Sequence, residues 1–147
     1  MSANLRAGIT LMEIVLVVAI FLVLFAVVLP VGVGFYRQYL LTAERDNLVA
    51  VLRRARSQAM SNYGQSNQGV SFQTSQYVIF RGASYAARLS DYDLVVPHSA
   101  GITLNASSSE IVFQALDGSA NVSGTIGLSG GATSINININ GEGRIDW

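Results

Sequence analysis

An uninterrupted apolar run from Ile9 to Leu29 constrains this chain more than any other feature of its sequence. Thr10 and Glu13 are the only polar residues among its 21 positions. As a helix the run would extend about 31 Å, which is the thickness of the hydrocarbon core of a bilayer. Because it carries no polar stripe, it does not fit a helix on the surface of a soluble domain. The sequence therefore predicts a membrane-spanning segment.

A secretory signal peptide is the competing interpretation of the run. Its apolar region usually has about 7–15 residues and is followed by a small-x-small cleavage site. The run here is longer, and residues 29–34 are a poor site of that kind. Glu13 is unusual in a spanning segment. Placing an ionisable side chain inside a bilayer costs at least a few kcal/mol of free energy, so such a residue is first interpreted as having a function. The alternative is that Glu13 lies near the end of the span and reaches headgroup water.

The residues that precede the run give Glu13 a context. A short polar leader, residues 1–8, ends at Gly8 and is followed by Ile9, Met12 and Glu13 in fixed order. This arrangement resembles the prepilin cleavage and methylation motif of type IV pilins and type II secretion pseudopilins. The resemblance implies that a prepilin peptidase cuts between Gly8 and Ile9 and methylates the amine of Ile9. Ile9 and Met12 depart from the commonest residues at their positions, but both are apolar.

The resemblance also implies a partner for Glu13. In an assembled filament the spanning helices leave the bilayer and pack as a core, where a carboxylate is costly unless it is paired. The new amine of Ile9 on a neighbouring subunit would supply the pairing charge. The cleavage that creates this amine would therefore also enable assembly.

Pro30 ends the apolar run, and Gly32 and Gly34 follow it. Proline removes a helix hydrogen bond, and glycine weakens the helix further. One interpretation is that the helix stops at the edge of the bilayer. The interpretation that the resemblance implies is a long helix that continues past Pro30, with a kink or a segment that can melt at these residues. We favour it because the helical pattern resumes at once.

The stretch 32–63 has the pattern of an amphipathic helix. A narrow apolar stripe recurs in it at helical spacing: Leu41, Leu48, Leu52, Ala55 and Ala59. Residues 37–56 hold five arginines against Glu44 and Asp46, a net charge of +3. We interpret these charges as the solvated flank of the helix, with ion pairs between subunits or a DNA-binding stripe as alternatives. Residues 52–59 also resemble the helix end of H-type minor pseudopilins and FimT-like pilins.

Short strands separated by turn signals follow Gly64. The predicted strand segments are 70–72, 77–80, 101–104, 111–113, 124–128 and 135–140, with the first two as a hairpin. The perfect alternation of 135–140 predicts one buried and one polar face. The expected fold class is α+β. A long N-terminal helix, membrane-spanning over 9–31 and amphipathic over 32–63, would pack on a head of five to seven antiparallel strands over 64–147.

The head also resembles the C-terminal head of the GspH/FimT group. The residues that carry this resemblance are Val112-Phe113, Asp117-Gly118, Thr125 to Leu128, Ile135 to Ile139 and Gly143-Arg144-Ile145.

The sequence offers little catalytic chemistry. No cysteine is present, which removes disulfides, thiolate metal sites and cysteine nucleophiles, and no phosphate loop, nucleophile elbow or zinc motif occurs. Asp91, Asp93 and His98 form the only dense group of metal-ligand types, and it lacks the EF-hand pattern. We expect no catalytic residue, no cofactor and no metal site, with a calcium site near Asp91 and Asp93 left open and His98 solvated in a loop.

The sequence thus predicts a structural subunit, a minor pilin or pseudopilin, of a type IV pilus or a type II secretion pseudopilus. Its implied partners are prepilin peptidase, other pilins or pseudopilins and an inner-membrane assembly platform. We expect a single-pass inner-membrane protein with its leader in the cytoplasm and its head outside, which later joins a periplasmic or extracellular filament. Arg6 in the leader agrees with the positive-inside tendency.

The alternatives are a DNA-binding pilin for natural transformation and the major pilin of the filament. Nine basic and nine acidic residues balance, so no global field favours nucleic acid. In residues 141–147, Arg144 stands between Glu142 and Asp146, a net charge of −1. We therefore expect no DNA binding through this tail.

Overall fold

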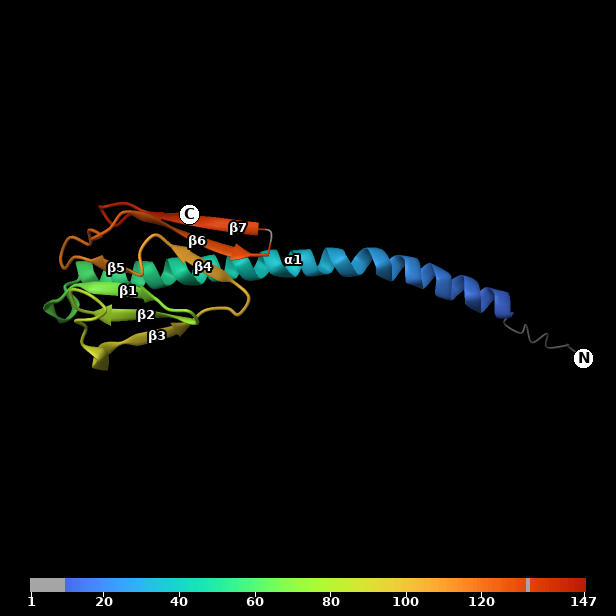
Figure 1. Ribbon diagram of the computed structural model, residues 1–147, viewed down its shortest axis with the longest axis horizontal. Coiled ribbons are helices and arrows are strands. Elements are labelled where there is room, and N and C mark those ends of the chain that lie inside the picture. Colours follow the sequence, from blue (N-terminus) through green and yellow to red (C-terminus); the bar gives the residue numbers. More distant parts are fainter. Residues whose placement is uncertain (1–9, 132) are drawn as a thin grey trace, which may run out of the picture. The chain divides into compact units, whose positions relative to one another are not determined.

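The computed structural model describes residues 10–131 and 133–147, without the side chains of residues 27–33. The leader, with the predicted cleavage site between Gly8 and Ile9, lies outside the described residues. The chain divides into a first unit that ends at Tyr36 and a second unit, Arg37–Trp147. One helix, α1 (Leu11–Met60), contributes to both units (Figure 1).

The backbone of α1 is helical through Pro30, Gly32 and Gly34, so the helix does not stop at the end of the apolar run. The kink predicted at these residues stays a prediction. Among the described residues, no helix is both long enough and apolar enough to cross a membrane.

The second unit contains two four-stranded sheets, both entirely antiparallel. Sheet A has the order β3-β2-β1-β5, and sheet B has the order β4-β6-β7-β8. The strands of sheet A are β1 (Gln68–Phe72), β2 (Gln76–Arg81), β3 (Leu94–Pro97) and β5 (Glu110–Phe113). Those of sheet B are β4 (Thr103–Ala106), β6 (Gly124–Gly130), β7 (Thr133–Ile139) and β8 (Ile145–Asp146). Two 3-10 turns, η1 (Tyr63–Gln65) and η2 (Ser90–Tyr92), complete the unit.

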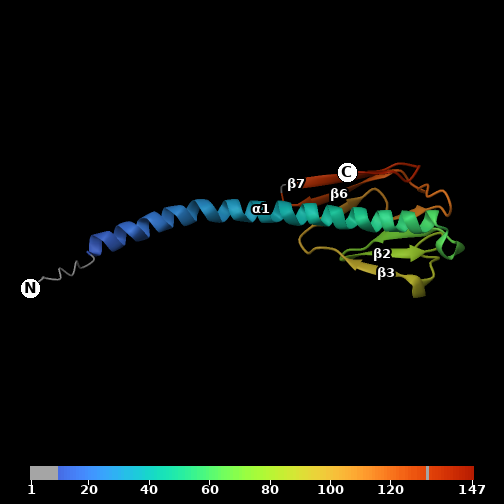
Figure 2. The same cartoon turned by 180° about the vertical axis from the view of Figure 1, so that it is seen from behind.

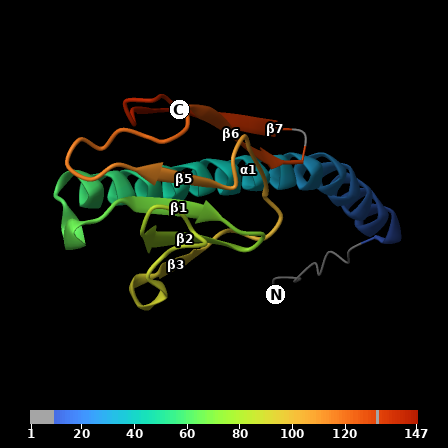
Figure 3. The ribbon, with the colours of Figure 1, turned by 60° about the vertical axis from the view of Figure 1, so that its left-hand side comes forward.

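The apolar stripe of α1 forms the centre of the core. All five predicted stripe residues are fully buried, and they cluster with apolar side chains of both sheets, such as Val70 and Phe113 from sheet A and Ile126 and Ile137 from sheet B. Figures 2 and 3 show this part of α1 running along both sheets. The predicted packing of an amphipathic helix on antiparallel strands is confirmed, and the fold is α+β.

The described residues contain more strands than the five to seven expected. The predicted hairpin is confirmed as β1 and β2, and β7 alternates as predicted, with Ile137 and Ile139 buried between exposed asparagines. Sequence patterning missed β3, which includes Pro97. Because β3 is an edge strand of sheet A, a proline at its end interrupts no internal ladder.

Candidate functional site

The first turn of α1 places Glu13 next to Thr10. The backbone N–H of Glu13 lies 3.1 Å from the carbonyl oxygen of Thr10 and 3.3 Å from its Oγ1. Thr10 is thus positioned as the N-cap of α1, with an acidic residue three positions later, as in a capping box. The negative charge of Glu13 also favours the positive end of the helix dipole. The pattern Thr-x-x-Glu carries this signal in the sequence, although we had interpreted Glu13 only as an anomaly of the span.

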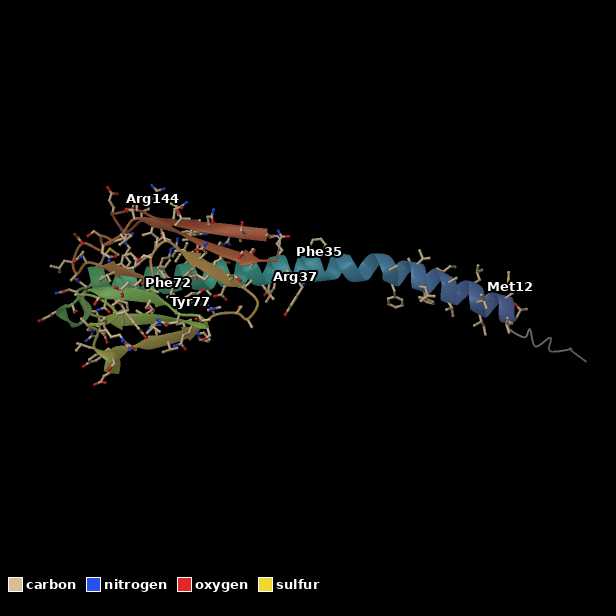
Figure 4. The ribbon with its side chains drawn as sticks, in the orientation of Figure 1. Met12, Phe35, Arg37, Phe72, Tyr77 and Arg144 are labelled. Carbon is tan, nitrogen blue, oxygen red and sulfur yellow. The ribbon has the colours of Figure 1, made fainter. Side chains whose placement is uncertain are left out.

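The described part of the first unit is an exposed apolar surface. Every residue from Thr10 to Ala26 is exposed. The large apolar side chains among them, from Leu11 to Phe25, are 45–82% exposed, and Figure 4 labels Met12 among them. A continuous apolar surface of this kind on a protein marks a site of contact with lipid or with another protein.

Further along α1, three aromatic side chains are exposed before the buried stripe begins. Phe35 and Tyr36 are 70% and 62% exposed in the first unit, and Tyr39 is 70% exposed in the second. Aromatic residues that combine an apolar ring with a polar end are enriched where membranes meet water.

The second unit buries a carboxylate that the sequence analysis placed in solvent. Glu44 on α1 is only 2% exposed. The hydroxyl of Tyr77 on β2 donates a hydrogen bond of 2.8 Å to its Oε1, and the backbone N–H of Ser99 donates one of 2.9 Å to its Oε2. The predicted solvation of Glu44 is therefore wrong. Glu44 lies three residues after Leu41 and four before Leu48, so it belongs to the buried stripe.

Ser99 lies in the connection from β3 to β4, which passes from sheet A to sheet B. One carboxylate thus ties α1 to sheet A and to the segment between the sheets. We refer to Glu44, Tyr77, His98 and Ser99 as the Glu44 cluster.

The cluster fixes the charge states of Glu44 and Tyr77. Burial raises the pKa of Glu44, but the hydrogen bonds from Ser99 and Tyr77, with the nearby His98, bring it below the ordinary value of 4.5. Burial, together with the hydrogen bond to Glu44 and its negative charge, raises the pKa of Tyr77 far above the ordinary value of 10.0. At neutral pH, Glu44 is therefore a carboxylate and Tyr77 a neutral donor.

His98 follows β3 in a loop, as predicted, but its ring is held in place. Its Nε2 lies 2.6 Å from the carbonyl oxygen of Thr74, and its Nδ1 lies 3.1 Å from that of Ser99. The ring also packs against Tyr77, with centroids 5.7 Å apart, and Phe72 meets the same tyrosine edge-on (Figure 4). A protonated imidazole can donate to both carbonyl oxygens, whereas a neutral one can donate to only one.

A second group of contacts joins the end of α1 to two turns. The Arg56 guanidinium donates from Nε to the carbonyl oxygen of Gly118 at 3.3 Å and from Nη2 to that of Glu142 at 3.0 Å. Gly143 has a φ of +74°, and the Gly118 carbonyl oxygen occupies the place that a β-carbon at residue 143 would need. The Asp117-Gly118 and Gly143 motifs, distant in sequence, therefore meet at Arg56. We call this contact the Arg56 node.

The C-terminal tail is paired with itself and with α1. Arg144 donates from Nε to Oδ1 of Asp146 at 2.8 Å, and its side chain is 71% exposed (Figure 4). Ile145 pairs with Ile139 of β7 and is buried, so the last strand closes sheet B. Trp147 is 49% exposed, and the Arg53 guanidinium lies 4.2 Å from the centre of its ring.

Of the two residues considered for a calcium site, Asp93 has another partner. Oδ2 of Asp93 accepts a hydrogen bond of 2.7 Å from Nε of Arg88, and Asp91 is exposed in η2. Within residues 10–131 and 133–147, no three histidine or acidic side chains come together in a way that could hold a metal ion.

Together these features define an α+β head built around one helix, which continues from an exposed apolar helical segment. The profile of the family described as "Type II transport protein GspH" matches residues 44–143. The match covers more than half of the chain, which belongs to this family of minor pseudopilins within the pilin and pseudopilin superfamily. The resemblance to the GspH group is thereby confirmed. No match was found among curated proteins or solved structures.

Proposed function

We propose that this chain is a structural subunit, a minor pseudopilin, of a type II secretion pseudopilus and has no catalytic activity. The observation that carries the proposal is the family match over residues 44–143. Its first residue belongs to the Glu44 cluster, and its last belongs to the Arg56 node. The matched region thus coincides with the part of the chain that these polar contacts hold together.

The exposed apolar surface supports an anchor in the inner membrane. Side chains such as Leu11 and Phe25 lower the free energy of the chain when lipid covers them before assembly and neighbouring subunits cover them afterwards. In this proposal residues 9–31 span the bilayer once, and Phe35, Tyr36 and Tyr39 lie at its outer boundary. The head lies outside the cytoplasm, and an inner-membrane assembly platform extracts the subunit into the filament.

Maturation by prepilin peptidase fits the start of α1. A cut between Gly8 and Ile9 leaves Thr10 in place as the N-cap of the helix, with the methylated amine of Ile9 one residue ahead of it. Glu13 is exposed, so its carboxylate is accessible to the amine of a neighbouring subunit. In this proposal, Pro30, Gly32 and Gly34 let the helix kink or unwind as subunits pack.

Co-purification from the native secretion apparatus tests the proposal. An affinity-tagged full chain, produced with that apparatus and captured after filaments have been sheared from cells, should bring other pseudopilins with it. A chain that remains a lone membrane protein, in cells that assemble filaments, would contradict the proposed role.

A further inference from the structure

A buried arginine without a counter-ion stands at one end of the layer between α1 and sheet A. Arg81, the last residue of β2, is 9% exposed. Within the described residues its Nε is buried and has no hydrogen-bond partner. The ion pairs in that part of the chain join Arg45 to Asp46, Arg88 to Asp93 and Arg144 to Asp146, and none involves Arg81. A buried charged donor left unpaired is costly, so this one calls for an acceptor.

Several neighbouring groups hold the Arg81 side chain in a fixed position. Its guanidinium carbon lies 4.7 Å from the centre of the Tyr63 ring and 4.1 Å from that of Tyr92. Gly64, with a φ of +69°, packs so closely against the guanidinium that a β-carbon there would displace it. Leu89 anchors the backbone through a 3.0 Å hydrogen bond to the Arg81 carbonyl oxygen. The two rings and Gly64 thus cover much of the guanidinium, and Arg81 also lines a pocket.

A pocket of about 150 Å³ opens beside this guanidinium. A second arginine, Arg54 of α1, lines it with the amides of Gln58 and Gln68. Ile79 and Leu94 supply apolar wall, and no acidic side chain takes part among the described lining residues. Two guanidiniums without a carboxylate favour a bound anion, and the apolar wall favours one carried on an aliphatic stem.

We propose that the Arg81 pocket binds a carboxylate, supplied by an acidic side chain of a neighbouring filament subunit. The planar carboxylate would accept hydrogen bonds from the guanidinium N–H groups that line the pocket, with its methylene groups against Ile79 and Leu94. The choice of a neighbouring subunit as the source rests on the proposed filament role. The existence of the carboxylate site does not.

Titration with acetate tests the site by itself. The full chain in detergent micelles, labelled with ¹⁵N-arginine, should show a saturable shift of the Arg81 Nε–Hε signal, with a Kd of about 10 mM. Inorganic phosphate should bind more weakly. Arg81→Gln should abolish saturable binding. Arg81→Lys keeps the charge but loses the planar, bidentate geometry of the guanidinium, so it should weaken acetate binding about tenfold.

Two further variants keep this test interpretable. Arg54→Gln, an exposed change, should weaken acetate binding several-fold even if substitution of Arg81 disturbs folding. The control Arg144→Gln removes an equal charge from the exposed tail and should leave the acetate Kd unchanged. Linear, non-saturating shifts in the wild type, equal losses in Arg144→Gln, or tighter binding of phosphate than of acetate would overturn the assignment.

Co-assembly tests the source of the carboxylate. Arg81→Glu should reduce co-purification with other pseudopilins at least tenfold, whereas Arg144→Glu should not. If acetate binds as expected but Arg81→Glu co-assembles like the wild type, a neighbouring subunit is excluded as the source. If the wild type itself does not co-assemble, the proposed function fails while the acetate result still decides the site.

Discussion

The hydroxyl of Tyr77 donates a hydrogen bond of 2.8 Å to Oε1 of Glu44, inside the layer between α1 and sheet A. Glu44 is charged and buried, and its other oxygen accepts from the Ser99 backbone. Removing one partner of such a contact leaves the others without a partner and without water. The Glu44 cluster is thus a place where a small chemical change should have a large effect on the stability of the head.

Glu44→Gln should destabilise the full chain by about 2 kcal/mol at pH 7, because the amide loses the charge that strengthens both hydrogen bonds. Thermal unfolding in detergent micelles, followed by near-ultraviolet circular dichroism, measures the difference. The control Glu142→Gln alters an exposed carboxylate and should change stability by less than about 0.5 kcal/mol. Equal stability of wild type and Glu44→Gln would contradict the role of the cluster.

The contribution of the Glu44 carboxylate to the stability of the head should depend on pH. The folded pKa of Glu44 lies below the ordinary value of 4.5, so the unfolded state binds the proton more tightly. The stabilisation is therefore present above about pH 4.5 and is lost as the pH falls through the lowered pKa. The stability gap between wild type and Glu44→Gln should narrow over that acidic range. A gap that widens on acidification would show that Glu44 is not stabilised as a carboxylate.

Gly143→Ala should destabilise the head by about 2–4 kcal/mol, because the new β-carbon would collide with the Gly118 carbonyl oxygen in addition to the strain of a positive φ. Gly101 is a matched control, since its φ is +87° but the space around its β-carbon position is open. Gly101→Ala should therefore lose only the stability that the strain of a positive φ costs, about 1 kcal/mol. If the two variants lose equal stability in thermal unfolding, the close approach at the Arg56 node is not important.

The local periodicities of the chain could be predicted from the sequence, whereas the burial of Glu44 could not. The stripe from Leu41 to Ala59 and the alternation of β7 are local periodicities, and both predict burial correctly. The burial of Glu44 depends on Tyr77 and Ser99, whose proximity arises only when the sheets pack on α1. The spacing of Glu44 from Leu41 and Leu48 places it on the stripe, but nothing local indicates that a hydroxyl and a backbone N–H will be there to pair with its carboxylate.

For the same reason, only part of the Arg56 node could be predicted from the sequence. The motifs at Asp117-Gly118 and Gly143 could be recognised one by one, but their meeting requires the turns after β5 and β7 to lie together. Likewise, Arg81 ends an apolar strand run, and nothing local indicates that Tyr63 and Tyr92 pack against it.

Glu13→Ala should hinder incorporation into filaments, because the amine of Ile9 on a neighbouring subunit would lose its proposed partner in an apolar core. Membrane insertion should be retained or improved, since the change removes a carboxylate from the apolar run. The amount of chain in sheared filaments, relative to the amount in membranes, measures the effect. Thr10→Val separates the local role of the helix cap from pairing, because it removes the Oγ1 acceptor and keeps Glu13. Incorporation of Glu13→Ala at the wild-type level would exclude pairing between subunits.

Arg144→Ala should change DNA affinity little. The Arg144 side chain is paired with Asp146, and Glu142 precedes it by two residues in the sequence, so the tail offers no cluster of positive charge for phosphates. Electrophoretic mobility shifts of the detergent-solubilised chain, at several salt concentrations, measure the affinity. Micromolar binding at physiological salt that disappears in Arg144→Ala would favour the DNA-binding alternative over the structural role.

The intact mass of the mature chain, purified from a host with an active prepilin peptidase, tests the central claim most directly. A processed pseudopilin begins at Ile9 and carries one added methyl group, and Gly8→Leu should block that cleavage because a bulky residue replaces glycine at the cut. Gly8→Ala, a smaller change, should be partly tolerated. The account predicts a wild-type mass equal to residues 9–147 plus one methyl group. A mature chain that still carries residues 1–8 in that host would contradict it.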